Sequence, residues 1–119
     1  MPNFQVDFYK KADGSIPVKE FLDSLDVKMR AKLLREVSLL EIAGNTLREP
    51  HSKPLGDGIF EIRAQQGSDI SRVLYFFVIG KTVILTNGFI KKTQKTPPNE
   101  IATALKYRDD YLKRKGNKP

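Results

Sequence analysis

Two arginines and three lysines within residues 63–95 are the side chains of this chain best suited to chemistry. Arg63 and Arg72 lie in segments that have the pattern of β-strands, and Lys91, Lys92 and Lys95 follow in a loop. Cations are uncommon inside strands unless an anion compensates, because burying or crowding them costs free energy. A sheet that gathers cations in this way is suited to a polyanion, and RNA is the first candidate.

The first turn between these strands predicts that the two arginines face each other. A hairpin centred between residues 67 and 68 places Arg63 directly opposite Arg72, where the two Cβ atoms lie about 4.5–5.5 Å apart. Like charges at that separation repel, and a phosphate held by two guanidinium groups would relieve the repulsion. In the alternative interpretation, Arg63 forms an ordinary surface ion pair with Glu61 or Asp69.

The second turn predicts where the lysine loop lies. A hairpin centred on Gly80-Lys81 places Phe89 opposite Arg72. The loop that contains the lysines then emerges at the same end of the sheet as the arginine pair.

The elements that must position this cluster predict an α+β domain that spans residues 1–119. Residues 44–58 are rich in Gly and Pro and are expected to form a loop. The order β-α-α-β-β-β-α predicts a small antiparallel sheet with an N-terminal helical hairpin packed on it and a C-terminal helix. The middle strand is apolar on both faces and should be covered on both. We expect a strand over 3–9, helices from Pro17 and over about 27–43, strands at about 59–66, 71–79 and 82–90, and a last helix capped by Asn99.

Charge is concentrated toward the end of the chain. Residues 1–86 carry 12 Lys/Arg against 11 Asp/Glu, whereas residues 87–119 carry 9 against 3. Localised positive charge binds phosphates through counterion release and also suits an acidic protein partner. The alternative is a solvated basic tail.

The residue inventory excludes several classes of site. The chain has no cysteine and one histidine, His51, so a disulfide framework, a thiolate or histidine-rich metal centre and a paired-histidine ribonuclease are excluded. We therefore predict neither a metal nor a small-molecule cofactor. His51 itself is expected to be a plain loop residue, with ligand contact as the alternative. No secretory signal and no apolar run near the ~20 residues of a membrane span are present, so we expect a cytoplasmic protein.

Three segments carry a resemblance to a known family. The segments are KPLGDGIFEIR, SRVLYFF and NGFIKKTQKTP, the last of which stands just before the final helix. With the N-terminal strand and helices, they resemble the RelE/ParE superfamily of type II toxin–antitoxin toxins, closest to the phage-derived HigB-like branch. The resemblance implies a microbial-RNase-like fold, cleavage of mRNA in the ribosomal A site, and a cognate antitoxin, often a helix-turn-helix DNA-binding protein.

The resemblance also implies roles for particular residues. Arg63 and Arg72 match basic positions on the family's second and third strands, and the lysine loop matches a further basic region. Tyr75 matches a strand aromatic that contacts RNA or belongs to the core. In one departure, Glu61 stands where RelE has a lysine. The predicted catalytic residues are Arg63, Arg72, Lys92 and Lys95, and the predicted RNA-binding residues are Lys53, Tyr75 and Lys91.

This set of residues suggests a metal-independent mechanism. Arginines stabilise the charge of the phosphorane but cannot take up a proton from the RNA 2′-OH. A lysine among other cations loses its proton more easily, so Lys92 or Lys95 is expected to handle protons.

Two other functions remain open at this point. The first is a ParE-like inhibitor of DNA gyrase, a protein-binding toxin without an active site. The second is a non-catalytic nucleic-acid-binding module or an inactive toxin. Convergence of cations on the strands favours RNA cleavage over both.

Overall fold

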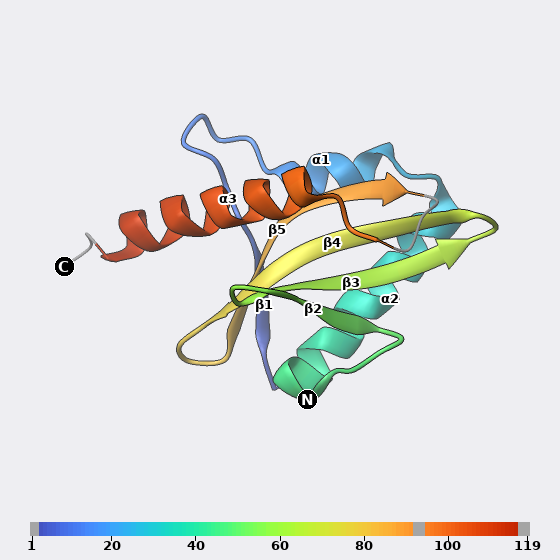
Figure 1. The fold of residues 1–119 in the computed structure, drawn as a ribbon, viewed down its shortest axis with the longest axis horizontal. Helices are drawn as coiled ribbons and strands as arrows, with labels where there is room; N and C mark the ends of the chain where they lie inside the picture. The colour runs from blue at the N-terminus through green and yellow to red at the C-terminus, as the bar shows by residue number, and fades with distance from the viewer. Residues whose placement is uncertain (1–2, 92–94, 117–119) are drawn as a thin grey trace.

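The computed structural model describes residues 3–91 and 95–116 of the protein, and these form an α+β fold (Figure 1). The predicted α+β class is confirmed, whereas the predicted element order omitted one strand. The elements are β1 (Gln5–Phe8), α1 (Pro17–Ser24), α2 (Val27–Ala43), the 3₁₀ turn η1 (Gly44–Thr46), β2 (Ser52–Gly56), β3 (Ile59–Gln66), β4 (Asp69–Val78), β5 (Thr82–Lys91) and α3 (Pro98–Gly116).

The five strands form one mixed sheet in the order β1-β5-β4-β3-β2. Strands β2 to β5 pair antiparallel with their neighbours, but β1 pairs parallel with β5. The predicted all-antiparallel sheet was therefore wrong at β1. After β1 the chain forms α1, α2 and then β2, β3 and β4. The last strand, β5, is the one that pairs with β1.

Strand β2 corrects the prediction of an uninterrupted loop over 44–58. It pairs with β3 at the edge of the sheet, and its register shifts between Pro54 and Gly56. An edge strand tolerates proline, because one side of the strand donates no hydrogen bond to a neighbour. The Pro- and Gly-rich composition therefore concealed a strand that positions Lys53 opposite Glu61.

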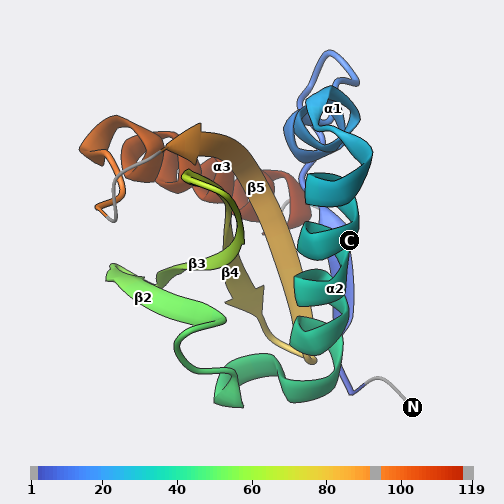
Figure 2. The same cartoon turned by 90° about the vertical axis from the view of Figure 1, so that its right-hand side faces the viewer.

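The helices lie on opposite faces of the sheet. In Figure 1, α3 lies in front of the sheet and α2 behind it, and Figure 2 shows α1 and α2 stacked along the same side. Alternation along each strand divides the core accordingly. The buried residues on the α1/α2 face include Ile62, Val73, Tyr75 and Leu85, and those on the α3 face include Ile59, Leu74, Phe76 and Ile84.

Strand β4 is buried on both faces over 73–76, as predicted for residues 73–79, whereas Ile79 lies beyond the strand and is exposed. Residues 70–76 are all buried, because β4 lies at the centre of the sheet with helices on either side. Its burial includes Arg72, a residue that a strand covered on both faces would not ordinarily accommodate.

Local signals fix the ends of α2. The Asp26 side chain accepts a hydrogen bond from the Met29 N–H at 2.8 Å, which caps the first turn. At the other end, Gly44 has φ = 53°, and a Cβ there would lie 2.0 Å from the Phe4 ring. Glycine is therefore required both by the positive φ and by the close approach of the Phe4 ring.

Helix α3 is tied to the start of the chain through Tyr9. The Tyr9 hydroxyl donates to Asp110 at 2.6 Å, and its ring stacks on Tyr107 with centroids 4.6 Å apart. Asp110 also accepts from Arg114 at 2.6 Å. Of the helices in the described ranges, none is long and apolar enough to cross a membrane.

Candidate active site

The register of the central hairpin brings the two arginines together. Arg63 is the pairing partner of Arg72, and Arg72 is the partner of Phe89, both as predicted. The second pairing depends on an irregularity: the β4–β5 register shifts by one residue between Leu74 and Tyr75. Because of this shift, Arg72 faces Phe89. Without it, Ser71 would be the partner of Phe89.

The arginine row lies just beyond the N-terminal end of α3. The Asn87 side-chain amide donates to the Glu100 carboxylate at 3.1 Å, which places the first turn of α3 beside the Leu74–Asn87 pair. From there the helix runs toward Phe76, whose ring packs against the Tyr111 ring with centroids 5.8 Å apart. The next row, which holds Arg63, Arg72 and Phe89, lies on the same sheet face but past the helix end.

Glu61 is the anion that accompanies both arginines. Arg63 Nε donates to Glu61 Oε2, and Arg72 Nε lies 3.8 Å from the same oxygen. The Thr96 hydroxyl donates to the other oxygen, Oε1. The alternative predicted for Arg63, an ion pair with Glu61, is therefore present, but it is a buried and shared contact rather than a surface one.

Burial distinguishes the two arginines. Arg72 and Glu61 are both 0% exposed, whereas 19% of the Arg63 side chain is exposed. Burial lowers the pKa of the Arg72 guanidinium, the Glu61 carboxylate raises it, and the Arg63 charge lowers it further. The guanidinium carbon also lies 5.8 Å from the centroid of the Phe89 ring, a cation–π distance. Arg63 thus presents the accessible charge, and Arg72 lies behind it.

Lysines surround this pair on the same side of the sheet. Lys53 is the pairing partner of Glu61, and it lines a cavity of about 360 Å³ together with Lys95, Thr96 and Ile101. Lys91 pairs with Ile70, one row beyond the arginines, and is exposed. Lys92 lies outside the described residues. Five of the seven predicted site residues therefore converge: Lys53, Arg63, Arg72, Lys91 and Lys95.

Tyr75 is the predicted site residue that the structure places elsewhere. It lies on the α1/α2 face, is 1% exposed and stacks on Phe60 with centroids 5.6 Å apart. Its hydroxyl lies 2.5 Å from Ser52 Oγ. Burial raises the pKa of Tyr75, against the opposing effect of the Ser52 hydrogen bond. Of its two predicted roles, the core role fits this position, and we correct the predicted RNA contact.

The sequence interpretation gave no site role to Glu61 or Thr96. A signal for Glu61 was present, because two facing arginines require an anion and Glu61 lies two residues from Arg63 on the same strand face. Thr96 carried no such signal, since its position depends on how the chain returns from β5 to α3.

His51 lies in the turn before β2, as predicted, and its side chain lines a second cavity beside Arg63. Its Nδ1 lies 2.8 Å from Glu36 Oε1, and the cavity of about 340 Å³ is lined by Glu36, Pro50, His51, Arg63, Gln65 and Ile70. Within the described parts of the chain, no group of three or more His, Asp or Glu side chains could hold a metal ion.

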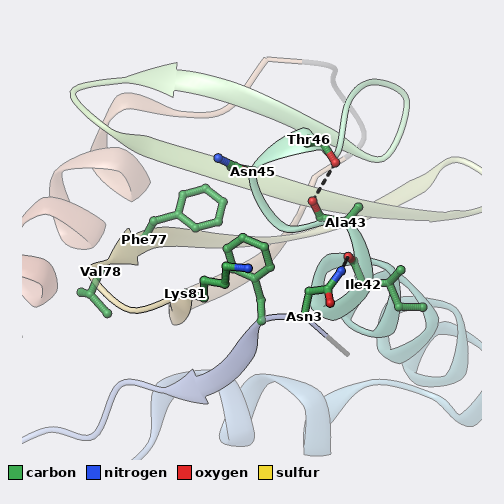
Figure 3. A pocket seen from close by; sticks show the side chains of 9 residues that line it. Asn3, Ile42, Ala43, Asn45, Thr46, Phe77, Val78 and Lys81 are labelled. Carbon is green, nitrogen blue, oxygen red and sulfur yellow. Dashed lines mark hydrogen bonds between the residues drawn. The ribbon is translucent and has the colours of Figure 1, made fainter. Parts of the chain in front are cut away.

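A larger cavity lies at the opposite end of β4, away from the arginines. It encloses about 540 Å³ between the C-terminal end of α2 and the β4–β5 turn (Figure 3). Phe4, Phe77 and Val78 contribute to its wall, and the Lys81 ammonium lies 5.9 Å from the Phe4 ring centroid. Of the predicted site residues that the structure describes, none lines this cavity.

Comparisons with known proteins identify the family of this chain. The family described as "phage derived protein Gp49-like (DUF891)" matches residues 20–109. Proteins named "Probable endoribonuclease HigB1" from two strains of Mycobacterium tuberculosis, CDC 1551 / Oshkosh and ATCC 25618 / H37Rv, are each 30% identical over 112 residues. The aligned region covers 94% of this chain and 87% of each relative. The chain therefore belongs to the phage-derived Gp49-like family, in the HigB-like branch of the toxins of toxin–antitoxin systems.

Proposed function

We propose that this protein is a ribosome-dependent mRNA endoribonuclease, the toxin of a type II toxin–antitoxin pair. The observation that carries the proposal is the facing pair Arg63–Arg72, set beyond the end of α3 and surrounded by Lys53, Lys91 and Lys95. The relatives are named probable endoribonucleases, which supports the same activity.

Arg63 and Arg72 stabilise the scissile phosphate in this mechanism. Arg63 is exposed enough to donate N–H groups to the phosphate, and the charge of Arg72, buried behind it, adds to the stabilisation of the charge that develops as the 2′-OH attacks phosphorus. The exposed part of Arg63 makes the first contact. Glu61 holds both side chains in position while the site is empty, which lowers the entropy lost when RNA binds.

The surrounding lysines bind the flanking backbone. Lys53 and Lys95 line one cavity beside the arginines, and Lys91 extends the basic surface one row further along the sheet. Lys92, with Lys95, stays a candidate for proton transfer. The reaction through the 2′-OH uses no metal and leaves a 2′,3′-cyclic phosphate and a 5′-hydroxyl.

In this mechanism the ribosome positions the RNA strand, which the surface of the protein does not do alone. The cavities beside the arginines are small, about 340 and 360 Å³, so the enzyme alone holds little of an RNA strand. Positioning on the ribosome converts a weakly bound strand into an aligned substrate, and correct alignment is a large part of catalysis. Activity on free RNA is therefore expected to be weak.

Membership of this family implies a cognate antitoxin. We propose a helix-turn-helix DNA-binding antitoxin, which would neutralise the toxin by covering the basic face or by blocking entry into the ribosome. Both modes depend on the same net charge of +7, which favours an acidic partner.

Primer extension on a reporter mRNA after brief induction tests the proposal. Wild-type protein is compared with Arg72→Ala and Lys95→Ala, each with and without the start codon of the reporter. We expect translation-dependent cuts within the reading frame, reduced by 10²- to 10³-fold in Arg72→Ala, the range typical of a lost charge-stabilising donor.

Two controls remove a cation on the other face. Arg35→Ala and Lys28→Ala alter exposed residues of α2 and should leave the cuts unchanged. Circular dichroism of each variant verifies that the fold is retained. Intact mRNA in arrested wild-type cells would replace this proposal with gyrase inhibition, and intact mRNA in growing cells would leave a non-catalytic binding module or an inactive toxin.

A further inference from the structure

The proposed reaction needs a group that accepts the proton of the 2′-OH, and the arginine cluster does not supply one. Guanidinium groups have no acceptor site. Glu61 has a carboxylate, but it is 0% exposed and its two oxygens are engaged by Arg63 and by Thr96. Glu61 is therefore suited to hold the arginines rather than to take a proton from a substrate.

His51 lies next to the partly exposed side chain of Arg63. The backbone N–H of Arg63 donates to the His51 carbonyl at 3.3 Å, and the His51 N–H donates to the Arg48 carbonyl at 2.9 Å. The first bond continues the β2–β3 pairing one residue past Ser52 and places His51 beside Arg63, and the second holds the turn before it. Both side chains line the same cavity of about 340 Å³, and 44% of the His51 side chain is exposed.

Glu36 determines which ring nitrogen of His51 carries the proton. Its carboxylate lies 2.8 Å from Nδ1 and is largely buried, with 14% of the side chain exposed. A carboxylate can only accept, so Nδ1 is the N–H donor in this contact. In the neutral imidazole, Nε2 then carries the lone pair and is a hydrogen-bond acceptor and a base.

We propose that His51, oriented by Glu36, is the general base of RNA cleavage in this protein. The inference deepens the proposed function and rests on it, because it names the proton acceptor of the same site. The arrangement repeats a general pattern in which a carboxylate holds the imidazole and the imidazole takes a proton from the attacking oxygen. The groups that face His51 are Glu36 from α2 and Arg63 from β3.

The step balances without a further reactant. The 2′-oxygen gives its proton to His51 Nε2 and forms a bond to phosphorus. The bond from phosphorus to the 5′-oxygen breaks, and that oxygen takes a proton from Lys95 or from water. The products are a 2′,3′-cyclic phosphate, a 5′-hydroxyl and an imidazolium that remains paired with Glu36.

The test uses purified full-length protein and programmed ribosomes, with cuts measured by primer extension over time. We expect His51→Ala to lower the cleavage rate by 10²- to 10⁴-fold, the usual contribution of general acid–base catalysis. Added imidazole should restore part of the activity of His51→Ala and none of Arg72→Ala. Such rescue would not occur if His51 only supported the fold.

Three further variants separate proton transfer from structure. His51→Gln keeps a donor for Glu36 but lacks a base, so it should melt like the wild type and cut as slowly as His51→Ala. Glu36→Gln keeps an acceptor for Nδ1–H and should retain most activity, whereas Glu36→Ala should lose at least tenfold. Glu20→Gln, at an exposed position of α1, is the matched control and should be unaffected.

The outcomes separate this inference from the function on which it rests. Cleavage by His51→Gln within threefold of the wild type, together with an inactive Arg72→Ala, would overturn the role of His51 and leave the endoribonuclease proposal standing. An impaired His51→Ala that imidazole does not restore would also overturn it. Wild-type protein that cuts no mRNA on ribosomes would overturn both.

Discussion

The α3 face of the sheet has two halves that meet the same physical problem in different ways. In one half, helix α3 covers Ile59, Leu74, Phe76 and Ile84, and burial of apolar surface stabilises the contact. In the other half, past the first turn of α3, the same strands carry Glu61, Arg63 and Arg72. These charged side chains, rather than apolar residues packed against a helix, occupy this half of the face.

Under the proposed function, this difference indicates which half of the face would receive RNA. A half covered by a helix cannot admit RNA without displacing that helix, and the free energy of its apolar contacts opposes this. In the proposed function, the charged half would exchange one set of ionic partners for another on binding a phosphate. An anion that enters there meets cations already held in place by Glu61 and Thr96.

Phe76→Ala tests the apolar half and has the largest expected effect on stability. Phe76 is 2% exposed and contacts Tyr111 of α3, so truncation leaves a cavity and should cost about 4 kcal/mol of unfolding free energy. Urea denaturation measures the loss. Leu112→Ala, at a position 47% exposed, is the control and should change little. A loss below that of the control would show that α3 contributes little to the core.

Glu61→Gln tests the charged half. It removes the carboxylate charge that Arg63 and Arg72 share, and removal of one partner from a buried ionic group should cost about 3 kcal/mol. Because a phosphate can replace the lost anion, added inorganic phosphate should recover part of this stability. The same addition should not rescue Phe76→Ala. Equal effects of phosphate on the two variants would remove the distinction between the halves.

Tyr9→Phe tests the far end of α3, where an apolar contact ends in a hydrogen bond. Loss of the Tyr9–Asp110 bond should cost about 1 kcal/mol at neutral pH. Burial, and then Asp110, raise the pKa of Tyr9 from 10.0 to about 12. The unfolded chain therefore loses this proton first, and the stabilisation is complete below pH 10 and is lost as the pH rises to about 12.

Denaturation of both proteins across this pH range isolates the contribution of Tyr9. Burial also raises the pKa values of Tyr75 and Tyr111, and both residues are present in each protein. The difference in stability between wild type and Tyr9→Phe should shrink above pH 10. A constant difference from pH 9 to 12 would contradict the role assigned to the Asp110 hydrogen bond.

Much of the site's alignment could be predicted because turns fix antiparallel register. The short turn at residues 67–68 alone determines that Arg63 faces Arg72. The pairing of Arg72 with Phe89 was predicted from a turn centred on Gly80-Lys81. In the structure it arises from a different turn position combined with the bulge at Leu74/Tyr75, and a sequence pattern gives no means to foresee that combination.

Other features depend on contacts between distant segments. β1 lies beside β5 only because the rest of the sheet has formed, and no local pattern states that the pair is parallel. The position of His51 depends on Glu36, which belongs to another element. Strand β2 was missed for the opposite reason, since Pro54 is a strong local signal that the edge of a sheet overrides.

The pairing of β1 with β5 has a consequence for how the chain reaches this structure. β1 pairs with residues 82–85, and Tyr9 hydrogen-bonds to Asp110 across 101 positions of sequence. Contacts of such long sequence separation require closure of large loops, and folding rates fall as their share rises. We expect the β3–β4 hairpin, with its facing arginines, to form early, and closure of the two chain ends to set the folding rate.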